Sequence, residues 1–188
     1  MRNIVISILI TNMHYIGGGF LCVVKHHDKE PYILLGRESY GKSKGLYADF
    51  GGGRDRDDGN INNTVLREAM EEFYIHIKNV YQLPYVDVPN HSGKKFYKLV
   101  IGRIDNYSPD YFYKMNNYYR KKSGGKYSKY AEMDKIILLP LSNIIQAIRE
   151  NKNYVRGLEG EKIRLRSRLW RAFKNTAALG IVTAISNN

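Results

Sequence analysis

Three glutamates on one face of a short helix, preceded by a run of glycines, constrain this chain more than any other part of its sequence. Glu68, Glu71 and Glu72 stand at positions i, i+3 and i+4 of a segment, 64–73, that we expect to be helical. That spacing puts the three carboxylates on one face, where like charges repel. No lysine is interleaved to relieve them, so an oxygen-ligated divalent cation, Mg²⁺ or Mn²⁺, is the natural counter-charge. The alternative is an ordinary acidic helix with a surface salt bridge to Arg67.

The glycines and acids fall at the spacing of a known motif. Gly51-Gly52-Gly53 precedes Arg67-Glu68, and Glu71-Glu72 follows. This arrangement resembles the Nudix box, G-x5-E-x7-R-E-U-x-E-E-x-G-U with U aliphatic, and Gly53 takes the place of its opening glycine. The resemblance is best over residues 20–77 and extends to about 148.

Two positions depart from the box. Gly59 stands where the family has its first glutamate, and Tyr74 stands where it has its late glycine. Family members pair that first glutamate with the arginine. Asp57 or Asp58 could substitute if the loop is re-spaced. A glycine after a helix usually serves a left-handed exit, so the helix before Tyr74 is expected to end differently.

The resemblance implies a fold and a chemistry. The fold is α+β: an α/β/α sandwich with a mixed sheet and a loop–helix–loop catalytic box. Glu68, Glu71 and Glu72 would hold metal, and Arg67 would orient them. The glycines Gly51, Gly52 and Gly53 would turn tightly and bring the backbone close to phosphate. The implied enzyme is a pyrophosphohydrolase that cleaves a phosphoric anhydride with metal-activated water.

Other candidate site residues lie outside the glutamate trio. Glu132 precedes an apolar strand, at about the point where some Nudix enzymes carry a general base or an extra metal ligand, although a solvated loop acid is the simpler reading. Glu38 and Asp49 are weaker candidates. Arg37 and Arg54 are candidates for binding phosphate.

Alternation of apolar and polar residues predicts the remaining elements. We expect strands at 4–10, 20–25, 32–35, 47–50, 81–88, 95–104 and 135–139, with Gly17-Gly18-Gly19 as a break. We expect helices at 64–73, 111–122 and 141–150, and a basic amphipathic helix at 161–175. Asn63 or Thr64 can cap the acidic helix. Residues from 176 onward are not placed, and residues 1–188 are expected to form a single domain.

The composition and net charge of the chain limit its possible binding partners and cellular location. The chain has 188 residues, with 30 Lys and Arg against 18 Asp and Glu, a formal net charge of +12. Such a surface attracts polyanions such as RNA, although a basic surface kept for solubility is the alternative. The single cysteine, Cys22, excludes an internal disulfide, and we expect a cytoplasmic protein. The first ten residues are too short an apolar run for a secretion signal, and no segment is long enough to span a membrane.

Aromatic and basic residues favour RNA among the possible polyanions. The chain has 16 tyrosines, and several alternate with lysine and arginine between Tyr111 and Tyr130. Aromatics stack bases while cations hold phosphates, although these tyrosines could instead face the core. The arginines of 161–175 could form a nucleic-acid track, with Trp170 and Phe173 as core anchors.

Three functions follow from these features. The leading one is hydrolysis of a nucleoside diphosphate linked to another group, with the 5′ cap of RNA as substrate, as in mRNA decapping. The second is hydrolysis of free nucleotides, dinucleoside polyphosphates or diphosphoinositol phosphates. The third is a non-catalytic RNA-binding protein on a Nudix scaffold, suggested by Gly59. A homodimer is compatible with each function.

Overall fold

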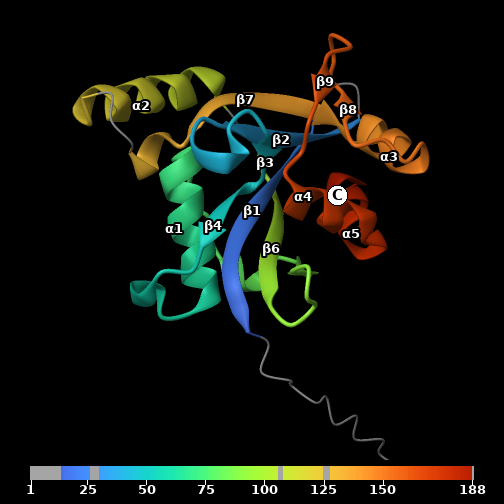
Figure 1. The fold of residues 1–188 in the computed structure, drawn as a ribbon, viewed down its shortest axis with the longest axis horizontal. Coiled ribbons are helices and arrows are strands. Elements are labelled where there is room, and N and C mark those ends of the chain that lie inside the picture. The colour runs from blue at the N-terminus through green and yellow to red at the C-terminus, as the bar shows by residue number, and fades with distance from the viewer. Residues whose placement is uncertain (1–13, 26–29, 106–107, 125–127, 188) are drawn as a thin grey trace, which may run out of the picture.

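A mixed β-sheet lies between two layers of helices (Figure 1). The computed structural model of the chain describes residues 14–25, 30–105, 108–124 and 128–187, so the strand expected at 4–10 lies outside them. Within these ranges the main sheet has seven strands: β1 Tyr15–Lys25, β2 Pro31–Glu38, β3 Tyr47–Ala48, β4 Phe50–Gly53, β5 Tyr85–Pro89, β6 Phe96–Arg103 and β7 Met133–Pro140. A small separate pair joins β8 Val155–Arg156 to β9 Lys162–Ile163.

The long strand β1 organises the sheet. One edge of β1 pairs in parallel with β6. Its other edge pairs antiparallel with β4 along Gly17–Phe20 and with β2 along Cys22–Lys25. The strand β7 then pairs antiparallel with β2 on the far side. The sheet is therefore mixed, and the glycine strand β4 is held directly against β1.

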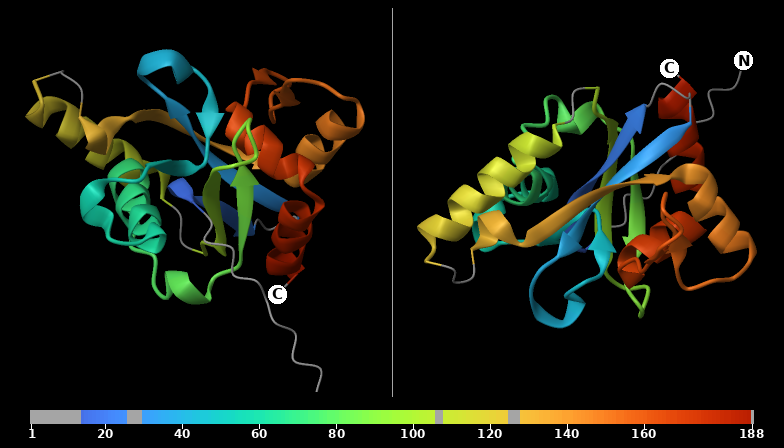
Figure 2. Two further views of the ribbon diagram at one scale, coloured as in Figure 1. Left: turned by 60° about the horizontal axis from the view of Figure 1, so that its bottom comes forward. Right: turned by 90° about the horizontal axis from the view of Figure 1, so that it is seen from above.

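Alternate side chains of β1 enter two separate cores, as the two-residue period of a strand requires. Phe20 and Cys22 are buried against the helices α1 Ile61–Phe73 and α2 Pro109–Lys122. Leu21 and Val23 are buried on the opposite face, beneath α3 Leu141–Arg149, α4 Ser167–Lys174 and α5 Thr176–Asn187. Figure 2 shows the helices covering both faces of the sheet. This arrangement confirms the expected α/β/α sandwich.

The glycine run in β1 is not the break that we expected. Gly17, Gly18 and Gly19 continue the strand and pair with Gly53, Gly52 and Gly51 of β4. A side chain at Gly19 would collide with the hydroxyl of Tyr97 and the carboxylate of Asp49. The glycines therefore allow two strands and a buried polar pair to approach closely, which a local pattern cannot distinguish from a loop.

The basic helix expected at 161–175 is shorter than predicted. Tyr47 exchanges backbone hydrogen bonds with Arg164 and Arg166, at 2.9 and 2.8 Å. Those bonds hold the segment before α4 extended, so the helix covers only Ser167–Lys174. Phe173 is buried and Trp170 packs partly buried beside it, as expected of core anchors. Residues 176–187, for which the pattern predicts no element, form α5.

A smaller difference concerns where one strand begins. The strand expected at 81–88 starts at Tyr85, after a 3₁₀ turn at Val80–Gln82. None of the helices in the described part of the chain has the length and apolarity needed to cross a bilayer.

Candidate active site

The acidic helix α1 starts earlier than its sequence suggested. Asn60 is its N-cap, and the Asn60 side chain accepts hydrogen bonds from the backbone N–H groups of Asn62 and Asn63, at 2.9 and 3.2 Å. Asn63 and Thr64, our expected caps, lie inside the first turns. The cap fixes the start of the helix because a side-chain oxygen satisfies donors that have no partner within the helix.

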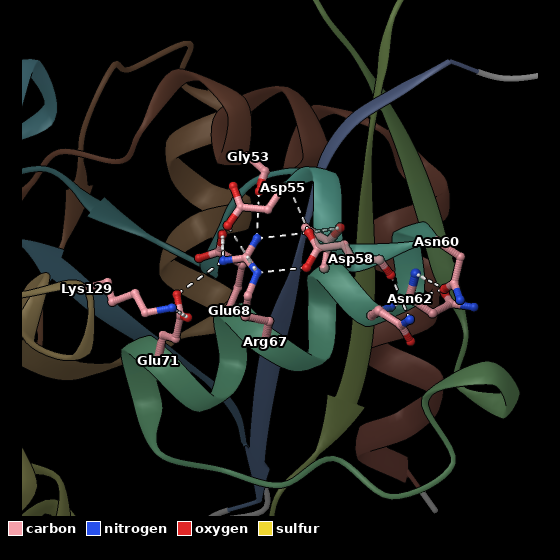
Figure 3. Close-up of polar contacts among 11 residues, drawn as sticks. Gly53, Asp55, Asp58, Asn60, Asn62, Arg67, Glu68, Glu71 and Lys129 are labelled. Atoms are coloured by element: carbon pink, nitrogen blue, oxygen red, sulfur yellow. Dashed lines mark hydrogen bonds and ion pairs between the residues drawn. The ribbon is translucent and has the colours of Figure 1, made fainter.

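Arg67 is the centre of the polar network on this helix (Figure 3). Its Nη1 donates to Glu68 at 2.8 Å and to Glu71 at 3.1 Å. Its Nη2 also donates to the carbonyl oxygen of Gly53, at 2.9 Å. The guanidinium thus ties the glycine strand to two of the three glutamates and fixes their orientation.

Asp58 supplies the carboxylate that the box lacks at Gly59. Asp58 receives Arg67 Nε at 2.8 Å on one oxygen and Nη2 at 3.0 Å on the other. Gly59 has φ +66°, a conformation that disfavours a side chain. The loop thus places its acid one residue early and turns at the glycine. The hydrogen bond from Arg67 lowers the pKa of Asp58 to about 2, so this carboxylate is ionised at neutral pH.

The three glutamates are all buried. Glu72 accepts the backbone N–H of Gly51 at 2.5 Å. Burial, followed by the charges of Glu68 and Glu38, raises the pKa of Glu72 well above its usual range. Burial also raises the pKa of Glu68 to about 7, against the lowering effect of Arg67. Such shifts mark carboxylates held close together away from water, which is typical of functional sites.

Two further acids approach the same cluster. The charges of Glu132 and Glu38 both raise the pKa of Glu72, which places them near it. Glu38 is paired with Arg166. The backbone carbonyl of Glu132 accepts the N–H of Ser39 at 2.8 Å, so the loop before β7 is fixed to the end of β2. The structure therefore gathers Glu132 and Glu38 beside the helix that carries the trio.

Asp49 lies in a buried polar group next to the glycine strand. Its carboxylate accepts the hydroxyl of Tyr97 at 2.6 Å and contacts Arg168 at 3.3 Å. It also adds to the raised pKa of Glu72. Asp49 is thus close to the cluster, but it is already bonded to two side chains.

We next asked whether the carboxylates of this site could bind a divalent cation. Among the described residues, no three acidic, histidine or cysteine side chains converge as a metal centre. Arg67 holds Glu68, while Lys129 and Arg67 both hold Glu71. The set still fits Mg²⁺ or Mn²⁺ in kind, because its donors are carboxylate oxygens crowded enough to raise one another's pKa.

Tyr74 ends α1 as a glycine would. Its φ is +59°, so it adopts the left-handed conformation even though it carries a side chain. The expectation that the helix ends differently is therefore wrong. The tyrosine hydroxyl donates to the carbonyl of Tyr130, and its ring stacks 5.8 Å from that of Tyr119. Packing of the ring offsets the strain of roughly 1 kcal/mol per left-handed residue.

The two candidates for binding phosphate, Arg37 and Arg54, bond to groups other than the three glutamates. Arg37 is paired with Asp134 at 2.7 Å. Arg54 is exposed and donates to the carbonyl of Gly59 at 2.6 Å. In the aromatic patch, Tyr111, Tyr113 and Tyr118 are exposed on α2. Tyr127 and Lys126 of the same patch lie outside the described residues.

Sequence reasoning missed Lys129 and the position of Arg168 at this site. Lys129 comes from a 3₁₀ turn, Lys129–Ala131, and pairs with Glu71 across 58 residues of chain. Arg168 of α4 donates to the carbonyl of Gly51 at 3.0 Å. The amphipathic pattern of α4 identified a basic helix, but no local signal indicated that it reaches the glycine strand.

Solved structures share this fold. No protein-family model matches the chain, and no curated protein matches it. The C. elegans Ap4A hydrolase, in a binary complex, aligns with a TM-score of 0.50 at 13% identity, over 87% of this chain and 96% of that one. The Nudix hydrolase RenU from M. smegmatis aligns with a TM-score of 0.50 at 12% identity, over 94% and 92%. The chain therefore has the fold of the Nudix hydrolases.

Proposed function

We propose that this protein is a divalent-metal-dependent hydrolase of a nucleoside diphosphate linked to another group, with the 5′ cap of RNA as its leading substrate. The observation that carries the proposal is the bidentate contact of Asp58 with Arg67. It supplies the ion pair that Gly59 had put in doubt. With this ion pair, the proposed site combines the arginine with three buried carboxylates on one face of α1.

Each residue of the site receives a role in this proposal. Glu68, Glu71 and Glu72 would hold the metal, and a bound Mg²⁺ or Mn²⁺ supplies charge neutralisation and a water of lowered pKa. Arg67 orients two of the glutamates through its Nη1. We assign Glu132 the role of general base, which accepts the proton of the attacking water. A general base must first lie within reach of the site, and Glu132 lies beside the helix that carries the glutamates.

The proposed reaction is hydrolysis of a phosphoric anhydride bond. A water oxygen attacks phosphorus, its proton passes to Glu132, and the bond between phosphorus and the bridging oxygen breaks. The products are a nucleotide and a second phosphorylated group. The peptides of Gly51 and Gly52 lie beside Glu72 and Glu68. With no side chains on these glycines, phosphate can approach the backbone closely.

Capped RNA is favoured over a small nucleotide by the surface. The formal net charge is +12, and α2 exposes Tyr111, Tyr113 and Tyr118. Lys122 Nζ lies 5.9 Å from the ring centroid of Tyr118. Exposed rings stack bases, and nearby cations hold phosphates. A hydrolase of small nucleotides would need neither feature.

The Ap4A hydrolase among the structural neighbours motivates the second candidate, a dinucleoside polyphosphate. Such a substrate contains the same pyrophosphate bond but no RNA body. A dinucleoside polyphosphate would make little use of the tyrosines on α2, so we place it second to capped RNA as a candidate substrate.

A substrate panel tests the proposal. Cap-labelled RNA, Ap4A and ADP-ribose would be compared at equal concentration with Mg²⁺ and with Mn²⁺. We expect the RNA to give the highest kcat/KM. We also expect Glu71→Gln and Glu72→Gln each to lower kcat by about 100-fold, and the matched control Glu150→Gln, an exposed glutamate, to leave it unchanged. Metal-independent RNA binding with no turnover of any substrate would leave only a binding protein.

A further inference from the structure

A cavity of about 240 Å³ lies on the other side of the glycine strand from the glutamates. Gly52 and Gly53 line one wall, and Arg166, Arg168 and Arg171 of the α4 region line another. Complete small-molecule pockets usually measure about 300–1,000 Å³. This volume suits a phosphate or diphosphate group better than a whole nucleotide.

Arg168 is the most deeply placed of the three arginines. Its side chain is 15% exposed, and its guanidinium carbon lies 3.7 Å from the ring centroid of Tyr97. Its Nη2 is bonded to Asp49 and to the carbonyl of Gly51. Its Nε is buried and has no hydrogen-bond partner within the described part of the chain. A buried donor left without a partner is costly, and an anion oxygen in the cavity would satisfy it.

Arg171 provides charge that no acid has neutralised. Its Nε donates to the backbone carbonyl of Pro89 at 3.2 Å. No carboxylate of the described residues is paired with Arg171, whereas Arg166 is paired with Glu38 and Arg168 with Asp49. The three arginines therefore carry one more charge than their partners. A fork of guanidinium donors matches the oxygens of a phosphate.

One strand separates the cavity from the glutamates. The backbone of Gly51 contacts both groups, because its N–H donates to Glu72 and its carbonyl oxygen accepts a hydrogen bond from Arg168. A Cβ on Gly52 would lie 2.6 Å from a carboxylate oxygen of Glu68. Gly52 thus borders both the cavity and Glu68.

We propose that this cavity is an anion subsite, which binds a phosphate group of the substrate next to the pyrophosphate that is cleaved. The proposal rests on the proposed function for its substrate, but binding itself requires no turnover. It gives the arginines of α4 a defined ligand in place of a general attraction for nucleic acid.

The first test measures binding of inorganic pyrophosphate to the metal-free, full-length protein by calorimetry. Arg171→Gln is compared with Lys174→Gln, which removes an equal charge from an exposed position on the same helix. We expect Arg171→Gln to weaken binding by about tenfold, since a charge-assisted hydrogen bond is lost. We expect Lys174→Gln to change it by less than about twofold. Equal effects of the two variants, or no saturable binding to the wild type, would overturn the subsite.

A second measurement separates the subsite from the proposed activity. In steady-state hydrolysis, Arg171→Gln should raise KM and leave kcat within about twofold, because the group binds rather than reacts. Turnover with unaltered KM and unaltered pyrophosphate affinity would refute the subsite and leave the hydrolase standing. Arginine-dependent pyrophosphate binding without turnover of any substrate would refute the hydrolase alone. Competition by a 5′-phosphorylated RNA oligomer would assign the site to RNA phosphates, and competition only by free diphosphates would assign it to small substrates.

Discussion

Replacing Asp58 with asparagine should destabilise the protein by about 2–3 kcal/mol at pH 7. In the structure its carboxylate accepts two hydrogen bonds from Arg67, one from the hydroxyl of Thr64 and one from the backbone N–H of Asp55, all between 2.8 and 3.0 Å. These contacts lower the pKa of Asp58 from 3.8 to about 2. One pKa unit corresponds to about 1.36 kcal/mol, so the ionised carboxylate contributes roughly 2.5 kcal/mol.

The sign of the pH dependence follows from the lowered pKa. The contribution is fully present above the unfolded value near 4 and is lost as pH falls toward 2. Urea unfolding at a series of pH values should therefore show the stability gap between wild type and Asp58→Asn narrowing from pH 5 to pH 3. The matched control Asp57→Asn removes an exposed acid from the same loop and should change stability by less than about 0.5 kcal/mol.

A compensating variant tests the register of the loop directly. Combining Asp58→Gly with Gly59→Glu returns the acid to the position that the Nudix motif gives it. Because Gly59 has φ +66°, a glutamate there is strained, and we expect neither stability nor activity to recover. The reasoning is refuted if Asp57→Asn costs as much as Asp58→Asn, if their gap is independent of pH, or if the double variant behaves as wild type.

Three further substitutions probe the site. Gly52→Ala should lower activity by about tenfold or more, because its Cβ would lie 2.6 Å from the carboxylate of Glu68. The control Gly53→Ala has open space around its Cβ and should leave activity nearly unchanged, so equal activities of the two variants would contradict this prediction. Tyr74→Gly should lower the free energy of unfolding by about 2 kcal/mol, since losing a buried ring outweighs relief of the φ +59° strain; stabilisation in urea melts would show that strain dominates. Lys129→Gln should tighten Mn²⁺ binding by about threefold in calorimetry, because it removes the ammonium group that is paired with Glu71. Unchanged affinity would mean that the lysine does not compete with Mn²⁺ for Glu71.

Local patterns were enough for the framework of the site. The i, i+3, i+4 spacing of the glutamates placed them on one helix face, and the alternation of apolar residues located most strands. Both follow from periods of the backbone that hold in any fold. The box motif supplied the expected sandwich, which the sheet and its two helical layers confirm.

The pattern failed where distant segments impose the local conformation. Gly17–Gly19 has the pattern of a break between strands but continues β1, because β4 pairs with it. The residues before α4 have a helical pattern but are extended, because Tyr47 bonds to them. In both cases hydrogen bonds to another part of the chain outweigh local propensity.

The sequence by itself determined which residues form the candidate site: the acidic face of α1, the arginine that orients it and the glycines that precede it. Only the tertiary structure decided which acid completes the arginine's ion pair, and that a helix 117 residues away reaches the glycine strand through Arg168. Spacing along a helix is set by its 3.6-residue turn, whereas a loop's path and a long-range contact depend on the packing of the whole chain.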